Sequence, residues 1–203
     1  MNLDTALDIH QGANLLFDQQ SVEKAVAELA VTVESHCKDD FPLVLCVMNG
    51  GLYLTGQLLR HWEFPLTVDY VHATRYRLAT LGKDVLWKAY PQNEIKDRNV
   101  IIIDDIFDQG YTLEEIKSYC MKQGAKSITS VFLIRKTHDR KKADIQPDYV
   151  GLECGDWYVY GYGMDMNSYF RNLSSIYFVE QKPITNTKTN AKVKPKVEIK
   201  GQT

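Results

Sequence analysis

The residues Val100-Ile-Ile-Ile-Asp-Asp-Ile-Phe-Asp-Gln-Gly-Tyr-Thr-Leu113 predict a strand, a loop and a helix in direct succession. Residues 100–103 are apolar and β-branched without alternation, which is typical of a strand buried on both faces. Helical spacing of apolar residues resumes after Thr112. Further apolar segments alternate with helical stretches along the chain, which favours a parallel sheet covered by helices.

The loop inside this stretch is suited to binding a phosphate group. A chain that turns through residues 108–110 into a helix directs successive backbone N–H groups, the Thr112 hydroxyl and the positive helix end at one point. Asp104 and Asp105 stand at the edge of the loop. Because carboxylates repel phosphate, these two are expected to bind hydroxyl groups or a magnesium ion that accompanies the phosphates.

The same run resembles the phosphoribosyl-pyrophosphate (PRPP) motif of type I phosphoribosyltransferases, in which an apolar strand and two acids precede Asp-Thr-Gly-x-Thr-Leu. Gln109 stands where threonine is commonest, which removes a hydroxyl but keeps a backbone N–H. The resemblance implies an α/β fold with a mostly parallel twisted sheet flanked by helices, and a small hood region over the active site. It implies that PRPP is bound by Asp104, Asp105, Asp108, Gln109, Gly110, Tyr111 and Thr112.

A second motif, Asn49-Gly50-Gly51, follows an apolar strand predicted at residues 43–48. Taken alone, a glycine pair is more often a plain tight turn. In the resemblance it is the pyrophosphate loop of the purine transferases, and Arg171 reaches the same pyrophosphate. The resemblance also makes the Met48–Asn49 bond a candidate non-proline cis peptide, a conformation found mainly at functional sites.

The polar stretch at residues 72–83 follows a strand predicted at residues 66–71 and has no clear period. It is either a surface hairpin or, by the resemblance, the flexible lid that closes over PRPP. The lid would include Arg75 and Tyr76, where many relatives have Ser-Tyr. A lid suits this chemistry, because a ribose carbon that loses pyrophosphate would be hydrolysed in open water.

The purine pocket is implied by the segment at residues 156–165, which strongly resembles the hypoxanthine-guanine phosphoribosyltransferases, and by Lys136, which follows a strand predicted at residues 131–134. Lys136 would bind the purine O6, Tyr158 would stack on the base and Val159 would offer backbone groups. Asp165 would hold magnesium through water, together with Asp104 and Asp105. Arg135 directly precedes Lys136, so either side chain could be the O6 donor.

Asp108 is predicted to be the acid/base residue at the purine ring. It lies in the loop, so its carboxylate can face the base while neighbouring backbone faces the 5′-phosphate. A carboxylate placed there can manage the proton of the attacking imidazole nitrogen. The alternative is that Asp108 only caps the following helix, which is predicted at residues 112–122 and ends before Gly124.

Composition favours one enzyme domain. The chain has 203 residues, 44% hydrophobic and 25% charged, and a net charge of −2. Residues 182–203 carry six lysines and one glutamate, so the domain at residues 1–181 is net acidic and is not expected to bind nucleic acid. The tail is predicted to be disordered. The four cysteines form no Cys-x-x-Cys pair and are expected to be reduced, mostly buried thiols.

Other elements follow from periodicity. A helix is predicted with Ser21 as its N-cap and an apolar stripe from Val22 to Val33. A further helix is predicted at residues 52–60, and further strands at residues 131–134, 149–152, 158–160 and 176–179.

The whole pattern is identified with a magnesium-dependent, cytoplasmic purine-salvage enzyme. By the resemblance, it converts hypoxanthine or guanine plus PRPP to IMP or GMP plus pyrophosphate, as a homodimer or homotetramer without contact with a membrane. Two alternatives remain open. One is a xanthine-preferring transferase, and the other is a non-catalytic regulator of the same fold that senses PRPP or nucleotides.

Overall fold

The computed structural model describes residues 2–75, 85–139 and 145–180. Its helices are α1 (Leu3–Gln11), α2 (Gln19–Cys37), α3 (Gly51–His61) and α4 (Tyr111–Lys122). Its strands are β1 (Asn14–Phe17), β2 (Leu43–Val47), β3 (Thr67–Arg75), β4 (Val85–Ala89), β5 (Asn99–Phe107), β6 (Ser127–Lys136), β7 (Tyr149–Cys154), β8 (Tyr158–Tyr160) and β9 (Ile176–Val179). Tyr76 and the tail at residues 182–203 lie outside the described residues, so the expectations about them stay predictions.

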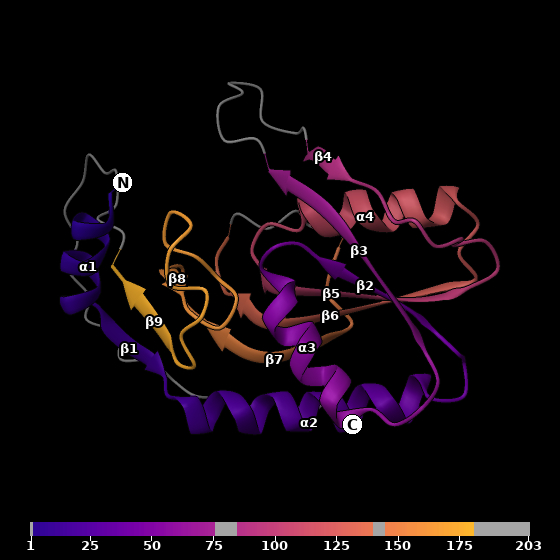
Figure 1. Cartoon of the computed structure of the whole chain (residues 1–203), viewed down its shortest axis with the longest axis horizontal. Coiled ribbons are helices and arrows are strands. Elements are labelled where there is room, and N and C mark those ends of the chain that lie inside the picture. Colours follow the sequence, from indigo (N-terminus) through magenta and orange to yellow (C-terminus); the bar gives the residue numbers. More distant parts are fainter. Residues whose placement is uncertain (1, 76–84, 140–144, 181–203) are drawn as a thin grey trace.

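The main sheet has the strand order β4-β3-β2-β5-β6-β7 (Figure 1). Strands β3, β2, β5, β6 and β7 pair in parallel, and β4 joins the edge in antiparallel orientation. The carboxyl ends of the five parallel strands therefore meet at one edge, which is where open α/β sheets bind their ligands. The expected mostly parallel sheet is confirmed.

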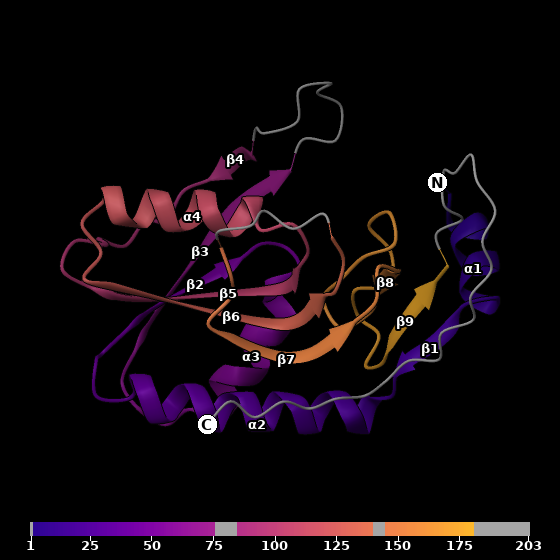
Figure 2. The same cartoon turned by 180° about the vertical axis from the view of Figure 1, so that it is seen from behind.

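Helices cover both faces of this sheet, with α2 and α3 on one face and α4 on the other (Figures 1 and 2). The side chains of successive β5 residues pack alternately against the helices on the two faces of the sheet. Ile101 and Ile103 pack in the core cluster that contains α2 and α3, whereas Val100 and Ile102 pack in the cluster that contains α4. A strand between two helical layers buries every residue, and this explains the continuous apolar run at residues 100–103.

A second, three-stranded sheet forms the expected hood, in the order β1-β9-β8. Together with α1, it lies beyond the ends toward which β5, β6 and β7 point (Figure 1). α1 is attached to it by His10, whose Nδ1 lies 2.8 Å from the Tyr160 hydroxyl oxygen, and by ring contacts of His10 with Phe170 and Tyr177. The hood therefore faces the ligand-binding edge of the main sheet.

Several element boundaries differ from the sequence predictions. The N-cap of α2 is Asp18, not Ser21, and the Asp18 carboxylate accepts a hydrogen bond of 2.8 Å from the Ser21 backbone N–H. The predicted start was wrong because the first turn of α2 is polar, whereas the apolar stripe begins only at Val22. Three short elements were not predicted: α1, β1 and β4.

Two strands also run further than their apolar cores. The β5–β6 pairing continues to Phe107, well past the predicted end of β5 at Ile103, and to Arg135, one residue past the predicted end of β6 at Ile134. Asp104 and Asp105, which were expected at the edge of the loop, are therefore residues of β5, and Lys136 is the last residue of β6. Backbone pairing extends a strand through polar residues that no apolar pattern would include.

The expectations for the cysteines, for Gly124 and for the Met48–Asn49 bond are confirmed. All four cysteines are free and buried. Gly124 follows the C-cap of α4 with a φ of 82°, the left-handed conformation expected of a C′ glycine. The Met48–Asn49 peptide bond is cis, as the resemblance implied.

Among the described residues, no helix is both long and apolar enough to cross a lipid bilayer.

Candidate active site

Two motifs lie in direct contact at the carboxyl ends of β2 and β5. They are the glycine loop at residues 49–51 and the acid pair formed by Asp104 and Asp105. A Cβ atom on Gly50 would overlap the carboxylate of Asp105. A Cβ atom on Gly51 would lie 2.5 Å from the backbone oxygen of Ile103 and 3.1 Å from Cα of Asp104. Glycine permits this approach because a Cβ atom at Gly50 would occupy the space of the Asp105 carboxylate, and one at Gly51 would occupy the space of the β5 backbone.

The two carboxylates occupy a site that disfavours their charge. Burial, together with repulsion by Asp105, raises the pKa of Asp104 well above its ordinary value. Burial also raises the pKa of Asp105, whereas the nearby Arg171 guanidinium lowers the pKa of both groups. Two adjacent buried carboxyl groups therefore gain from hydroxyl donors or from a hard divalent cation, which prefers oxygen ligands.

Arg171 and Asp165 form the opposite wall of this site. The Arg171 guanidinium donates hydrogen bonds of 2.6 Å to the Gly163 carbonyl and 2.7 Å to the Asp165 carboxylate. Gly163 has a φ of 98°, and a Cβ atom there would overlap the carbonyl oxygen of Gly50. The segment after β8 is thereby held against the glycine loop. The negative charge of Asp165 also contributes to the raised pKa of Asp105.

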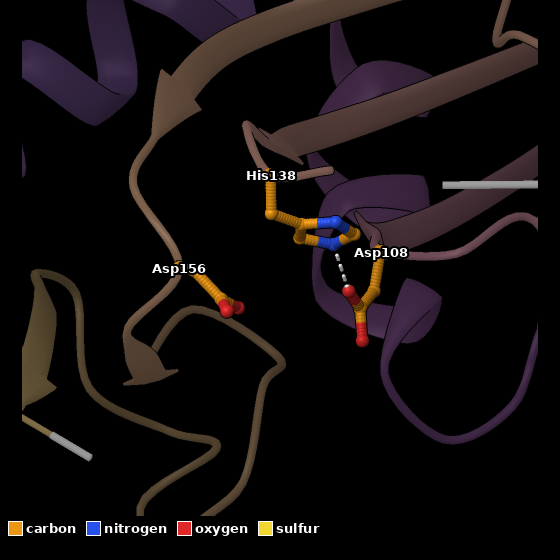
Figure 3. Close-up of side chains that lie close together, drawn as sticks. All are labelled: Asp108, His138 and Asp156. Carbon is orange, nitrogen blue, oxygen red and sulfur yellow. Dashed lines mark hydrogen bonds and ion pairs between the residues drawn. The ribbon is translucent and has the colours of Figure 1, made fainter. Parts of the chain in front are cut away.

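Asp108 lies in the segment between β5 and α4, and its carboxylate contacts the Nε2 atom of His138 (Figure 3). His138 follows the end of β6, which is the neighbouring strand. The N-cap of α4 is Gly110, with a φ of 88°. The alternative that Asp108 caps this helix is therefore wrong, and its carboxylate is committed to His138.

Asp156 approaches the same pair from the segment between β7 and β8 (Figure 3). One nitrogen of His138 and one carboxylate oxygen each of Asp108 and Asp156 lie within 4.8 Å of one another. Sequence reasoning missed both His138 and Asp156. No local motif distinguishes His138, because its partner precedes it by 30 residues and is reached only through the pairing of β5 with β6.

The structure separates the two candidate donors for a purine O6. Arg135 forms an ion pair with Glu153, its partner in the β6–β7 register. Lys136 is only 9% exposed, and it pairs in register with Cys154. Burial raises the pKa of the Cys154 thiol to about 12, while the nearby Lys136 ammonium opposes this rise. Lys136 forms no ion pair with any residue that the structure describes.

The two expected purine-binding residues Tyr158 and Val159 lie on β8. The Tyr158 hydroxyl donates a hydrogen bond of 3.0 Å to the Asp165 backbone carbonyl, which ties the ring to the segment that carries Arg171. The side chain of Val159 is buried in the core, so only its backbone groups can face a ligand. The segment that leads into β8 carries Asp156, which lies beside Asp108 and His138, and the preceding strand pairs Cys154 with Lys136.

The predicted phosphate loop ends at the first turn of α4. Gly110 provides no capping side chain, and the first intrahelical bond runs from the Glu114 N–H to the Gly110 carbonyl. The N–H groups of residues 111–113 therefore point out of the helix end beside Gln109 and Thr112, as a phosphate site requires. A Cβ atom on Gly110 would lie 2.6 Å from a methyl carbon of Ile145, so this turn is closely packed.

The lid prediction falls partly outside the described residues. Arg75 is the last residue of β3 and pairs antiparallel with Val85, the first residue of β4. Tyr76 lies outside the described residues. The site residues that the structure does describe thus come from the ends of β2, β5 and β6, from the start of α4 and from the segments before and after β8.

Comparison with known proteins identifies this arrangement. A family model described as a phosphoribosyl transferase domain matches residues 12–168. The hypoxanthine-guanine phosphoribosyltransferase of Bacillus subtilis is 33% identical over 168 residues, which cover 82% of this chain and 93% of the relative. The hypoxanthine-guanine-xanthine phosphoribosyltransferase of Tritrichomonas foetus is 27% identical over 177 residues, which cover 84% and 93%.

A solved structure agrees. The crystal structure of a hypoxanthine-guanine phosphoribosyltransferase from Bacillus anthracis matches with a TM-score of 0.77 at 29% identity, and the match covers 82% of this chain and 98% of that one. Since the family model spans most of the chain, the protein belongs to the phosphoribosyl transferase family. Its fold is that of the type I members, and at this similarity to its curated relatives it is a phosphoribosyltransferase enzyme.

Proposed function

We propose that the protein is a purine-salvage transferase that converts hypoxanthine or guanine plus PRPP to IMP or GMP plus pyrophosphate. In this reaction a purine ring nitrogen forms a bond to C1′ of the ribose, and the bond from C1′ to the pyrophosphate oxygen breaks. The proton on the purine ring passes to the protein. The proposal is supported by the family membership and by the names of the relatives.

The choice of a 6-oxopurine rests on one observation, which is that Lys136 is buried without an ion pair to any described residue. A lysine that is 9% exposed and forms no ion pair with the described residues is unusual in a stable core. Such a buried cation is expected where a ligand supplies the missing acceptor. A carbonyl oxygen such as O6 accepts a hydrogen bond from an ammonium group, whereas the amino group of adenine would need an acceptor instead.

The PRPP site is assigned to the ends of β2 and β5. Asp104 and Asp105 hold the ribose hydroxyls, and residues 109–112 bind the 5′-phosphate with backbone N–H groups and the Thr112 hydroxyl. Residues 49–51 and Arg171 bind the pyrophosphate. Two donors of the Arg171 guanidinium are engaged with Gly163 and Asp165, which leaves others of its five N–H groups for a phosphate oxygen.

The base site is assigned to the space between β6 and β8. Lys136 donates to O6, the Tyr158 ring stacks on the purine, and Val159 contributes backbone groups. Asp108 accepts the proton from the imidazole part of the base. Arg75 and Tyr76 belong to the lid that excludes water while the ribose carbon is electron-deficient.

Magnesium is the proposed metal. The donor set fits it, because Asp104, Asp105 and Asp165 offer carboxylate oxygens, and burial raises the pKa values of the first two, so that their charged forms would gain from a bound cation. When bound with PRPP, the ion would neutralise charge that develops on the departing pyrophosphate. Asp165 would act through water, since its two carboxylate oxygens already accept hydrogen bonds from Arg171 and Ser168.

The proposed partners are PRPP and the purine base, and the proposed assembly is a homodimer or homotetramer in the cytoplasm. The net acidic composition of residues 1–181 argues against nucleic acid as a partner. A xanthine-preferring enzyme is the nearest alternative, in view of the relative from Tritrichomonas foetus that is named for all three bases. A non-catalytic regulator of the same fold is the more distant one.

An assay with separate bases tests the proposal. The protein is incubated with Mg²⁺, PRPP and hypoxanthine, guanine, xanthine or adenine, and the nucleotide formed is measured. IMP and GMP should form readily, and adenosine monophosphate hardly at all. Fastest turnover with xanthine would favour the alternative enzyme. Tight PRPP binding without turnover of any base would establish the regulator and overturn the proposal.

A further inference from the structure

We infer that His138 is a positioning residue that fixes the carboxylate of Asp108 for its work on the purine proton. The inference rests on the proposed role of Asp108. The contact joins two segments that are 30 residues apart, one after β5 and one after β6 (Figure 3). A base whose carboxylate is oriented by a third group follows the general logic of activated catalytic side chains.

The burial of the two side chains supports an orienting role. The His138 side chain is 4% exposed, whereas the Asp108 side chain is 38% exposed. The imidazole ring is thus packed inside the protein, and the carboxylate that it contacts opens toward the site. An ionised carboxylate only accepts hydrogen bonds, so Nε2 of His138 donates to Oδ1 of Asp108. The second carboxylate oxygen then keeps one fixed direction for the substrate.

Asp108 needs such a partner because its position in the chain does not fix the direction of its side chain. It lies between the end of β5 and the N-cap of α4, outside both elements, and it does not cap the helix. A side chain in such a segment can rotate between several staggered conformations. Proton transfer requires a geometry held to within a fraction of an ångström, which a contact with a buried ring can supply.

Using a histidine for this task also keeps Lys136 available. Asp108, His138 and Asp156 lie together, and Lys136 precedes His138 by two residues at the end of β6, where it pairs in register with Cys154. If Lys136 held Asp108, its charge would be neutralised and it could not serve O6. In the structure His138 contacts Asp108 and Lys136 forms no ion pair with the described residues, so the two functions are divided between two side chains.

Two substitutions of similar size separate the hydrogen bond from the packing. His138→Gln retains an N–H donor near the position of Nε2, whereas His138→Leu fills the buried space without a donor. We expect His138→Leu to lower kcat about 10-fold with the KM for PRPP within about twofold, because only an interaction used in the reaction is lost. His138→Gln should keep most of the kcat. Thermal melting of both variants controls for folding.

The same two substitutions are repeated in the Asp108→Asn protein. If His138 acts through Asp108, His138→Leu should change the residual kcat less than about twofold in that background. Equal losses in both backgrounds, or equal losses for His138→Gln and His138→Leu, would overturn the inference and leave His138 as a packing residue. Normal kcat in Asp108→Asn alone would instead overturn the role of Asp108. No turnover by the unaltered protein with any base would overturn the proposed function.

Discussion

Gly50 lies directly against the carboxylate of Asp105, so the turn after β2 and the acid pair at the end of β5 share one space. The two strands are neighbours in the sheet, with Cys46 beside Ile103 in register. The pyrophosphate loop and the ribose-binding acids of the proposed mechanism are therefore one structural unit. A change in either should alter PRPP binding before it alters binding of the base.

Gly50→Ala tests this unit. The added Cβ atom would overlap the Asp105 carboxylate, which belongs to a side chain that can rotate away, so the protein should fold with the Asp105 carboxylate displaced. We expect the KM for PRPP to rise about 10-fold or more, with a smaller change in the KM for the base. Steady-state kinetics with each substrate varied measures the split.

Gly56→Ala is the matched control, because Gly56 lies on α3 and a Cβ atom there has no heavy atom within 4 Å. This substitution in a helix should stabilise the protein by about 0.5–1 kcal/mol without changing either KM. Unchanged PRPP kinetics in Gly50→Ala would contradict the proposed pyrophosphate loop.

Asp108→Asn tests the acid/base assignment. The change removes the proton acceptor but keeps the size and most of the hydrogen-bonding ability of the side chain. We expect kcat to fall by about two orders of magnitude with little change in melting temperature. The measurements are kcat with saturating substrates and a thermal melt. Near-normal kcat in a well-folded Asp108→Asn protein would leave Asp108 as a loop-shaping residue.

Lys136→Ala and Arg135→Ala together test the O6 donor. Lys136 is buried beside Cys154, whereas Arg135 is paired with Glu153. Lys136→Ala should therefore raise the KM for the 6-oxopurine far more than the KM for PRPP, because the base oxygen loses its charged donor. Arg135→Ala should leave the KM for the base nearly unchanged. The reverse pattern would show that Arg135 is the donor.

Asp105→Asn should stabilise the ligand-free protein at neutral pH. Burial raises the pKa of Asp105 in the folded state. Such a group adds stability below its unfolded pKa, which is near 3.9, and this stability is lost as pH rises through the folded pKa. At pH 7 the folded chain therefore bears the cost of a buried charge, which asparagine removes.

Thermal melts without Mg²⁺ and PRPP check this prediction. The melting temperature of Asp105→Asn should exceed that of the unaltered protein at pH 7, and the difference should shrink as pH is lowered toward 4. Asp39→Asn, at an exposed surface acid, should show no such trend. A lower melting temperature for Asp105→Asn at pH 7 would mean that Arg171 outweighs the effect of burial on Asp105.

Deletion of residues 182–203 tests the proposed domain boundary. The composition of this tail, rich in lysine and poor in apolar residues, is unsuited to burying surface. The shortened protein should keep its kcat and its melting temperature nearly unchanged. A large loss of either in the deletion variant would show that the tail docks on the domain.

The sequence by itself determined the layered fold and the main motifs. An apolar run without alternation is typical of a strand that is covered on both faces, and residues 100–103 lie between two helical layers. Residues 158–160 and 176–179 form strands with the predicted bounds. Elements stabilised mainly by distant partners were missed. β1, for example, is a four-residue strand defined by its pairing with β9.

The tertiary structure alone decided which side chains meet. The order β2-β5-β6-β7 sets Gly50 against Asp105 and His138 against Asp108, and no local pattern encodes strand order. The register of β6 with β7 places Arg135 beside Glu153 and Lys136 beside Cys154, where Lys136 is buried. The sequence alone does not distinguish these two adjacent basic residues. Local periodicity reflects the burial of each segment, whereas contacts between segments depend on how the whole chain packs.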